Sequence, residues 1–179
     1  MMKLAERMIN NFCSSISASN GHRWTTLSGL NDVGVRVTVP KPTDPGQPNG
    51  VVLSAATSLW LPVSPQTVFN FFKDERTRPQ SKRSPTLQMA HIQGTVYLFF
   101  VQNNMLILQE SCTDLSGSLV VYAPVDLPAI NIAMSGEDPS YIPVLPSGFT
   151  ISPDGRSDNS DSGASSSSNL QGATFLSSK

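Results

Sequence analysis

The stretch from Val51 to Arg78 constrains the fold of this chain most, because it has the pattern of a strand that runs directly into a helix. Along residues 51–60 the side chains alternate between two faces of an extended chain, and one face is the more apolar. Ser64 stands at a helix N-cap position and Pro65 at the first helical position, where its missing N–H costs nothing. The apolar stripe of this helix consists of Val68, Phe69, Phe71 and Phe72. Pro79 forbids continuation, so we expect a short helix that packs back on a sheet.

The sequence on either side predicts a second helix and several strands. Residues 3–18 carry apolar side chains every four positions, from Leu4 to Ile16, which is typical of an amphipathic helix. The clearest hairpin joins residues 105–112 to 118–125 through a turn at 113–117. Further strands are expected at residues 24–30 and 33–40, which form a hairpin, at 87–92 and 95–101, and at 141–145 and 149–152, which form a last short pair.

This order of elements predicts an α+β domain with an antiparallel sheet and with its helices gathered on one side. From Asp154 onward, serine, asparagine, aspartate and glycine dominate the sequence. Such a segment cannot bury enough apolar surface to offset its ordering entropy. We therefore expect a folded domain over residues 1–153 and a serine-rich disordered tail over residues 154–179.

Composition excludes several classes of protein. The formal net charge of -1 gives no bulk attraction to nucleic acid or to an acidic membrane. Cys13 and Cys112 are too few for a disulfide framework, and with two histidines they match no recognised zinc-site spacing, so a reducing intracellular compartment is expected. The first residues have no signal-peptide pattern, and no apolar run is long enough to span a bilayer. The expectation is a soluble chain with no membrane span.

Few residues suggest catalysis or metal binding. No serine lies in a Gly-x-Ser-x-Gly motif, and the only candidate bases are His22 and His91. His22 is expected to be solvated at a turn, and His91 to be half-buried and hydrogen-bonded in a strand. A spacing similar to that of a calcium loop occurs at Asp154-Gly155, Asp158 and Asp161. The bidentate glutamate of such a loop is missing, so this segment is interpreted as a solvated linker.

The basic residues and the tryptophans also favour structural roles. The one basic cluster consists of Arg76, Arg78, Lys82 and Arg83. These residues are dispersed, so a solvated helix end is the favoured interpretation over a phosphate-binding or nuclear-import patch. Trp24 and Trp60 lack interleaved basic residues, so both are expected to be core anchors rather than stacking platforms for bases.

Several ordered phrases of the sequence resemble one known family. They are Lys3-Leu-Ala-Glu-Arg-Met, Asn10-Asn-Phe-Cys, Asp44-Pro-Gly, Val52-Leu-Ser-Ala-Ala-Thr-Ser-Leu-Trp-Leu-Pro-Val-Ser-Pro, Met89-Ala-His-Ile, Met105-Leu-Ile-Leu-Gln-Glu-Ser-Cys, Val120-Val-Tyr-Ala-Pro-Val-Asp-Leu-Pro-Ala and Leu145-Pro-Ser-Gly-Phe. Together they resemble the C-terminal region of plant class IV homeodomain-leucine zipper proteins, which follows the START domain. The resemblance implies a nuclear transcription factor that dimerises through its zipper and whose START domain senses lipid.

The chain departs from the family pattern in three places. The homeodomain, the zipper and the START domain are absent, so no DNA-contacting residue of the family can be assigned here. Residues 79–86 do not continue the central helix as in the family, and residues 93–104 are shorter and different. Residues 170–179 do not match the closing strand and long C-terminal helix of the family. A truncated or divergent relative, or an imperfect gene model, is the interpretation that follows.

The patterns and the resemblance together predict an incomplete START-like helix-grip fold, with a curved antiparallel sheet, the helix at residues 64–76 packed near it, and no closing helix. The expected role is a non-enzymatic regulatory or interaction region of a transcription factor, with protein partners or a dimer mate and without direct DNA binding. The alternative is a stand-alone START-like module that binds a lipid or small apolar ligand, and a hydrolase is a distant third. No catalytic, cofactor or metal residue is assigned, and no ligand-binding residue can be named. A ligand carrier should show a continuous apolar cavity, whereas an interaction module should show an exposed apolar patch.

Overall fold

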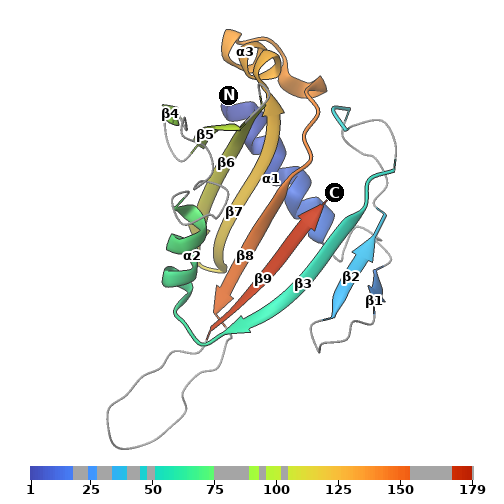
Figure 1. Cartoon of the computed structure of the whole chain (residues 1–179), viewed down its shortest axis with the longest axis vertical. Helices are drawn as coiled ribbons and strands as arrows, with labels where there is room; N and C mark the ends of the chain where they lie inside the picture. The colour runs from blue at the N-terminus through green and yellow to red at the C-terminus, as the bar shows by residue number, and fades with distance from the viewer. Residues whose placement is uncertain are drawn as a thin grey trace, which may run out of the picture.

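In a computed structural model, the described residues form one antiparallel sheet of nine strands (Figure 1). The structure describes residues 1–17, 24–27, 34–39, 45–47, 51–74, 89–92, 96–101, 105–153 and 171–178, and for 89–92, 96–101 and 171–178 the backbone alone. The strands lie in the order β1-β2-β3-β9-β8-β7-β6-β5-β4, and every neighbouring pair is antiparallel.

As far as β7 the elements follow one another as helix, strands, helix, strands, as the sequence predicts. Their bounds are α1 Met2–Ile16, β1 Thr25–Leu27, β2 Val35–Thr38, β3 Ser54–Leu61, α2 Pro65–Lys73, β4 Met89–Ile92, β5 Val96–Val101, β6 Met105–Asp114, β7 Gly117–Asp126, α3 Leu127–Ser135, η4 Pro139–Tyr141, β8 Ser147–Pro153 and β9 Gln171–Ser178. The cap of α2 is confirmed, because the Ser64 hydroxyl accepts a hydrogen bond from the Thr67 amide at 3.2 Å. The predicted hairpins β1–β2 and β6–β7 are confirmed as well.

The last strand contradicts the sequence-based interpretation of the C-terminal residues. The sequence predicts a disordered tail without a closing strand at residues 171–178, yet these residues form β9 between β3 and β8. Both edges of β9 are paired, so its backbone hydrogen-bonding groups are satisfied by two neighbouring strands. Residues 154–170, which hold the other part of the expected tail, lie outside the described residues.

The back face of the sheet, defined here as the face toward α1, carries the larger part of the core. Leu4, Met8 and Phe12 of α1 are buried against the sheet. Their partners are alternate residues of the central strands, namely Leu106 and Leu108 of β6 and Val121, Ala123 and Val125 of β7. Burying each large side chain of this kind stabilises the fold by about 1.5–3 kcal/mol. This helix therefore accounts for much of the stability of the domain.

The front face, defined as the face toward α2, holds a second and smaller core. Val68 and Phe69 of α2 pack on Val120 of β7 and Ile151 of β8. Val120 and Val121 are consecutive in one strand and point to opposite faces, so α1 and α2 lie on opposite sides of the sheet (Figure 1). The expectation that the helices gather on one side is wrong, because alternation in β7 gives both faces apolar residues to cover.

Between β7 and β8 the chain differs from the predicted pair of short strands. Leu127–Ser135 is a helix, α3, whose cap Asp126 accepts a hydrogen bond from the Ala129 amide at 2.9 Å. Residues 139–141 form the short helix η4, and the predicted strand at 141–145 is absent from this described part of the chain. The expectation was wrong because Asp138 and Pro139 start a helical turn instead, with the Asp138 carboxylate accepting a hydrogen bond from the Ser140 amide at 3.1 Å.

One arginine joins the segments that follow α3 to α1. The guanidinium of Arg7 donates hydrogen bonds to the backbone carbonyls of Pro139 (2.7 Å), Ser140 and Ile142. Gly46 lies against the same group, since a Cβ atom placed on it would stand 2.7 Å from a guanidinium nitrogen and 2.6 Å from the carbonyl oxygens of Ser140 and Ile142. The Asp44-Pro-Gly phrase of the sequence therefore includes a glycine that the packing requires.

Candidate functional site

The front face between α2 and the β1–β3 edge is the candidate functional surface. Strand register brings Ser111, Val120 and Phe149 into one row across β6, β7 and β8. The same row continues through the β9 backbone to Thr57 in β3, Val35 in β2 and Leu27 in β1. Paired residues of antiparallel strands share a face, so these side chains all lie on the α2 side of the sheet.

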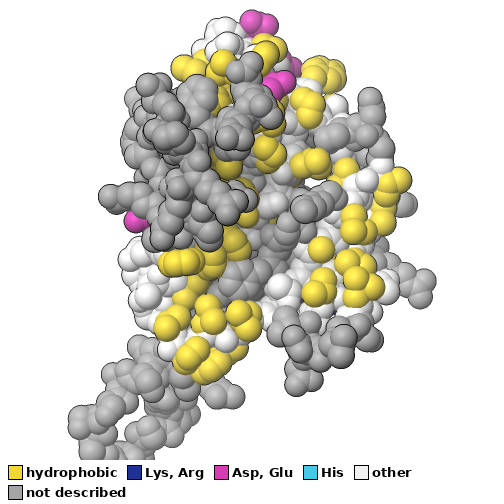
Figure 2. Space-filling model, in the orientation of Figure 1, with side chains coloured by type: hydrophobic (Ala, Val, Ile, Leu, Met, Phe, Trp, Pro, Cys, Tyr) yellow, Lys and Arg dark blue, Asp and Glu magenta, His cyan; other side chains and the backbone are white. Residues whose placement is uncertain are grey.

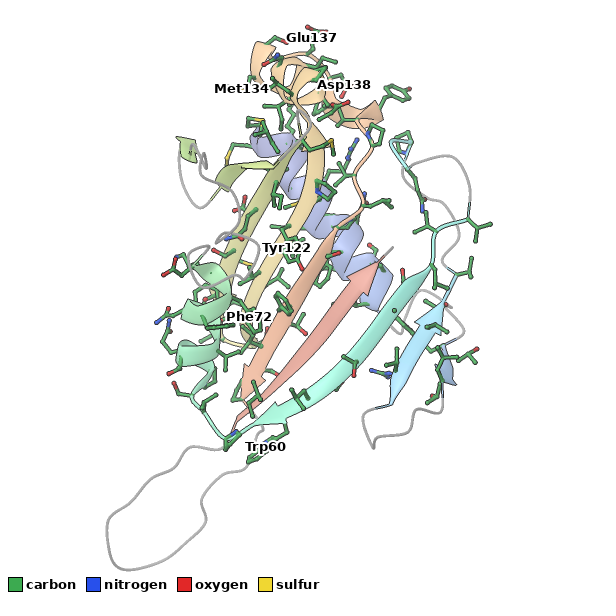
Figure 3. The ribbon with its side chains drawn as sticks, in the orientation of Figure 1. Trp60, Phe72, Tyr122, Met134, Glu137 and Asp138 are labelled. Atoms are coloured by element: carbon green, nitrogen blue, oxygen red, sulfur yellow. The ribbon has the colours of Figure 1, made fainter. Side chains whose placement is uncertain are left out.

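An aromatic cluster occupies the α2 end of this row. The rings of Phe72 and Phe149 stack with their centroids 3.9 Å apart and an interplanar angle of 21°. Phe71 meets Phe72 edge-on at 5.2 Å, and Tyr122 approaches Phe149 at 6.1 Å. Such contacts add about 0.5–1.5 kcal/mol per pair beyond area burial. The Phe72–Phe149 pair joins α2 to the sheet. Figure 3 shows Phe72 on α2 and Tyr122 on β7 in this region.

Two buried polar side chains lie beside the aromatic cluster. Gln109 is fully buried, and its amide nitrogen donates to the Lys73 carbonyl at 3.2 Å, which ties β6 to the last turn of α2. Ser111 is 2% exposed, and its hydroxyl has no hydrogen-bond partner among the described residues. A buried hydroxyl without a partner costs free energy, and it offers a hydrogen bond to a group that approaches it.

The other end of the row is apolar and open to solvent. At this end the exposed fractions are 51% for Leu27, 36% for Val35 and 40% for Leu59, which lies on the same face. At the α2 end, Phe71 is 53% exposed. Figure 2 shows hydrophobic side chains over α2 and over β2 and β3 on this side. In β2 and β3 the positions that face front, which are Val35, Val37, Ala55, Thr57, Leu59 and Leu61, carry no charge. This end has the features of an exposed apolar patch.

The two tryptophans have different environments. Trp24 is partly buried against the back-face core, and the Arg36 guanidinium lies 5.8 Å from its ring centroid. Trp60 is 47% exposed, so the expectation that it anchors the core is wrong. Trp60 lies on the back face near the C-terminal end of β3, opposite Gly172. The buried back-face residues of β3 are Ser54 and Ala56, at the other end of the strand. Figure 3 shows Trp60 at the far end of the molecule from α3.

Of the residues that could serve in catalysis or metal binding, His91 falls within the described part of the chain. His91 lies in β4, where its backbone pairs with Tyr97. His22, the aspartates at 154, 158 and 161, and the basic cluster at 76–83 lie outside the described residues. In the described part of the chain no three His, Cys, Asp or Glu side chains are arranged to hold a metal ion. None of its helices combines the length and apolarity needed to cross a membrane.

Both cysteines are exposed, free thiols on the α1 side of the sheet, Cys13 in α1 itself and Cys112 in β6. Burial of part of each side chain raises the pKa of the Cys13 and Cys112 thiols above the usual value. For Cys112, the nearby acidic groups Asp114 and Glu110 raise the pKa further. Raised thiol pKa values leave both cysteines as thiols near neutral pH, so neither has the depressed pKa of a catalytic nucleophile.

The front-face row cannot be recognised from the sequence alone. Within each strand the sequence shows only that side chains alternate between two faces, as at Leu59 in β3, Tyr122 in β7 and Phe149 in β8. Only the register of β3, β9 and β8 brings these alternating positions into one surface. That register depends on β9, which the sequence did not predict.

This arrangement of sheet and helices is that of a START-like α+β domain. Human StAR-related lipid transfer protein 5 has the same fold, with a TM-score of 0.51 over 98% of this chain and 78% of that protein, at 9% sequence identity. Identity at this level shows the fold alone. The predicted fold class is confirmed, with the difference that the sheet holds the closing strand β9.

The chain belongs to the family of PDF2-like C-terminal domains, whose model matches residues 1–177. Its curated relatives are plant homeobox-leucine zipper proteins, which confirms the resemblance stated from the sequence. ROC8 of Oryza sativa subsp. japonica is 58% identical over 185 residues, covering 94% of this chain and 26% of the relative. HDG11 of Arabidopsis thaliana is 56% identical over 183 residues (94% and 25%), and ANTHOCYANINLESS 2 of the same species is 47% identical over 192 residues (98% and 24%). The chain spans about a quarter of the length of these relatives.

Proposed function

We propose that this domain is a non-enzymatic regulatory region of a nuclear class IV homeobox-leucine zipper transcription factor, and that it binds a protein partner through the front face of β2 and β3. The observation that carries the proposal is the uncharged apolar surface around Val35 and Leu59, which is exposed in the described structure. Exposed apolar surface of this kind is costly in water and marks interaction sites in soluble proteins. Family membership supports the transcriptional context.

Two neighbouring residues of β3 allow a matched test. Leu59 faces front and is exposed, while Ser58 is also exposed and faces back. Residues 1–179 are fused to a heterologous DNA-binding domain, and reporter output is measured in plant protoplasts. We expect the fusion to change reporter output, Leu59→Asp to abolish the change and Ser58→Asp to keep it. Equal activity of the two variants would reject the front face, and a fusion without any effect would reject the regulatory role.

Direct DNA binding is not part of the proposed function. Specific binding requires side chains that reach base edges and several phosphate contacts from lysine or arginine. The chain has 12 basic against 13 acidic residues, and Arg7 is engaged with backbone carbonyls. A fluorescence-anisotropy titration compares the promoter element bound by the relatives with a scrambled duplex at physiological salt. We expect weak, equal, salt-sensitive binding to both, and a clear preference for the true element would contradict this part of the proposal.

A second candidate function is binding of a lipid or small apolar ligand on the same face. The observation that favours it is the buried, unpartnered Ser111 hydroxyl in the same row as Phe149, beside the stacked ring of Phe72. The fold is shared with a protein whose name describes lipid transfer, which is compatible with this candidate. Solvent extraction of the purified chain followed by mass spectrometry tests it. A stoichiometric lipid, lost in the Phe149→Ala variant, would favour ligand binding over the protein partner.

A further inference from the structure

The first residue of the chain is held against helix α3. The backbone nitrogen of Met1 donates a hydrogen bond to the Ala133 carbonyl in α3 at 2.8 Å. Met1 also packs partly buried against the back-face core. Figure 1 shows the N-terminus beside α3. Any polypeptide that precedes Met1 must therefore leave the domain next to the last turn of α3.

Large apolar side chains are exposed around this entry point. Met1 and Ala133 are joined by the hydrogen bond, so the residues that follow them, Met2 and Met134, lie close together. Their exposed fractions are 60% and 59%. Tyr141 in η4, which contacts both α1 and α3, is 75% exposed. Methionine side chains are flexible and polarizable, and they are common at surfaces that bind a partner.

Two carboxylates border these apolar side chains. Glu137 and Asp138 are exposed directly after α3, and Figures 2 and 3 show acidic side chains and Met134 at this end. Hydrogen bonds from the Ser140 hydroxyl and amide, with the nearby charges of Lys3 and Arg7, lower the pKa of Asp138. The carboxylate is therefore ionised at neutral pH. Of these two cations, Arg7 already donates hydrogen bonds to the backbone carbonyls of the segment after α3.

We propose that this surface, called the α3 cap and consisting of Met2, Met134, Glu137, Asp138 and Tyr141, is where the preceding part of a longer homeobox-leucine zipper polypeptide packs on the domain. The contacting segment would be apolar, with a lysine or arginine opposite the two carboxylates. The matched family is a C-terminal domain, and the curated relatives are about four times longer than the matched region, so a long polypeptide enters at this end in such proteins. The inference rests on family membership and is independent of the front face.

The charge of the cap favours this occupant over two others. A second copy of the chain packed symmetrically on the cap would place Glu137 and Asp138 near their own counterparts, and like charges across an interface cost free energy. A membrane surface rich in anionic lipid would repel the same carboxylates. An adjacent, covalently linked segment meets neither obstacle, and its linkage gives it a high effective concentration at the cap.

Hydroxyl-radical footprinting tests the proposal, because radicals label exposed methionine and leucine side chains. The labelling of Met2 and Met134 is compared between the isolated chain and a chimera in which residues 1–179 replace the matching region of the rice relative. Leu115, fully exposed on the β6–β7 turn at the opposite end of β6, is the internal reference. We expect labelling of both methionines to fall severalfold in the chimera at every protein concentration, while Leu115 labelling is unchanged.

Two variants of the chimera separate docking from a general change in shape. Met134→Glu should restore Met2 labelling to the level of the isolated chain, and Glu137→Lys should restore it in part, whereas Leu115→Glu should leave the protection intact. Circular dichroism confirms that each variant is folded. Equal labelling of the isolated chain and the chimera would overturn the proposal. Protection that appears only at high concentration would also overturn it, because it would assign the cap to a second copy. Either failure leaves the Leu59→Asp reporter result unaffected.

Discussion

Replacing Gly46 by alanine should be among the most destabilising single changes in this domain. A Cβ atom at Gly46 would lie 2.6 Å from the carbonyl oxygens of Ser140 and Ile142, which is 0.8 Å inside the 3.4 Å at which ordinary contact begins. It would also lie 2.7 Å from the Arg7 guanidinium, whose hydrogen bonds hold the segment after α3 on α1. Neither a carbonyl nor the bonded guanidinium can retreat without breaking these contacts.

The magnitude follows from two costs. Overpacking a filled site costs about 1–3 kcal/mol. Weakening one hydrogen bond to a charged group costs about 1.5–3 kcal/mol. Because the Arg7 site can relax in part, we expect Gly46→Ala to lower the free energy of unfolding by about 3 kcal/mol. Urea denaturation followed by circular dichroism measures the change as a lower midpoint at constant slope.

Gly34 provides the matched control for this experiment. A Cβ atom there would meet only the Thr26 methyl group at 3.7 Å, an ordinary contact, so Gly34→Ala should shift the midpoint little. Combining Gly46→Ala with Arg7→Met should cost much less than the sum of the two, since both remove the same set of contacts. An identical midpoint for Gly46→Ala and Gly34→Ala would refute the reasoning, and full additivity with Arg7→Met would refute the shared site.

Three further outcomes are expected. Gly136→Ala should lower the free energy of unfolding in urea denaturation by about 1–2 kcal/mol, because Gly136 has a left-handed φ of 89°. An added Cβ would meet nothing within 4 Å, so the cost comes from the backbone alone, and Gly136→Asn should cost less. Phe12→Ala should cost about 3–5 kcal/mol and Trp60→Ala less than half of that, since Phe12 is 1% and Trp60 47% exposed; equal thermal midpoints would contradict this. Hydrogen bonds from the Ser116 hydroxyl and amide lower the pKa of Asp114 in the folded state. The contribution of Asp114 to stability is therefore present above its unfolded pKa and is lost as pH falls through the lower folded pKa. In the curve of unfolding free energy against pH, Asp114→Asn should make the decrease below about pH 4 less steep.

The elements that the sequence predicted are those specified by local patterns. The stripe of α1, the Ser64 cap of α2 and the β6–β7 turn each depend on residues within a few positions of one another. In that turn the Asp114 carboxylate accepts a hydrogen bond from the Gly117 amide at 3.2 Å, and Gly117 has a φ of 149°. Local hydrogen bonds and backbone preferences leave a signature in the sequence, so elements of this kind can be predicted from it.

The elements that differ from the sequence-based prediction are β9, which depends on distant partners, and α3, which has local signals. Strand β9 is rich in serine and small residues, and pairing with β3 and β8 supplies the stability that its own composition does not predict. Helix α3 has a local signature, with Asp126 at its N-cap, Pro128 in its first turn and Gly136 at its C-terminus, so it could have been predicted. The front-face row could not, because its existence depends on β9.

The two faces of β3 link the fold to the proposed function. On the back face, Ser54 and Ala56 are 4% exposed, and Ala56 belongs to the core packed by α1, so small side chains are needed where the helix approaches the sheet. On the front face, Thr57 is half-buried and Leu59 is exposed. Ala56→Leu should therefore cost about 1–3 kcal/mol by overpacking, while Thr57→Leu should change the urea midpoint little and strengthen partner binding in the reporter assay. Equal destabilisation by the two changes would mean that the front face of β3 is already filled, and the apolar patch would then belong to the core rather than to an interaction surface.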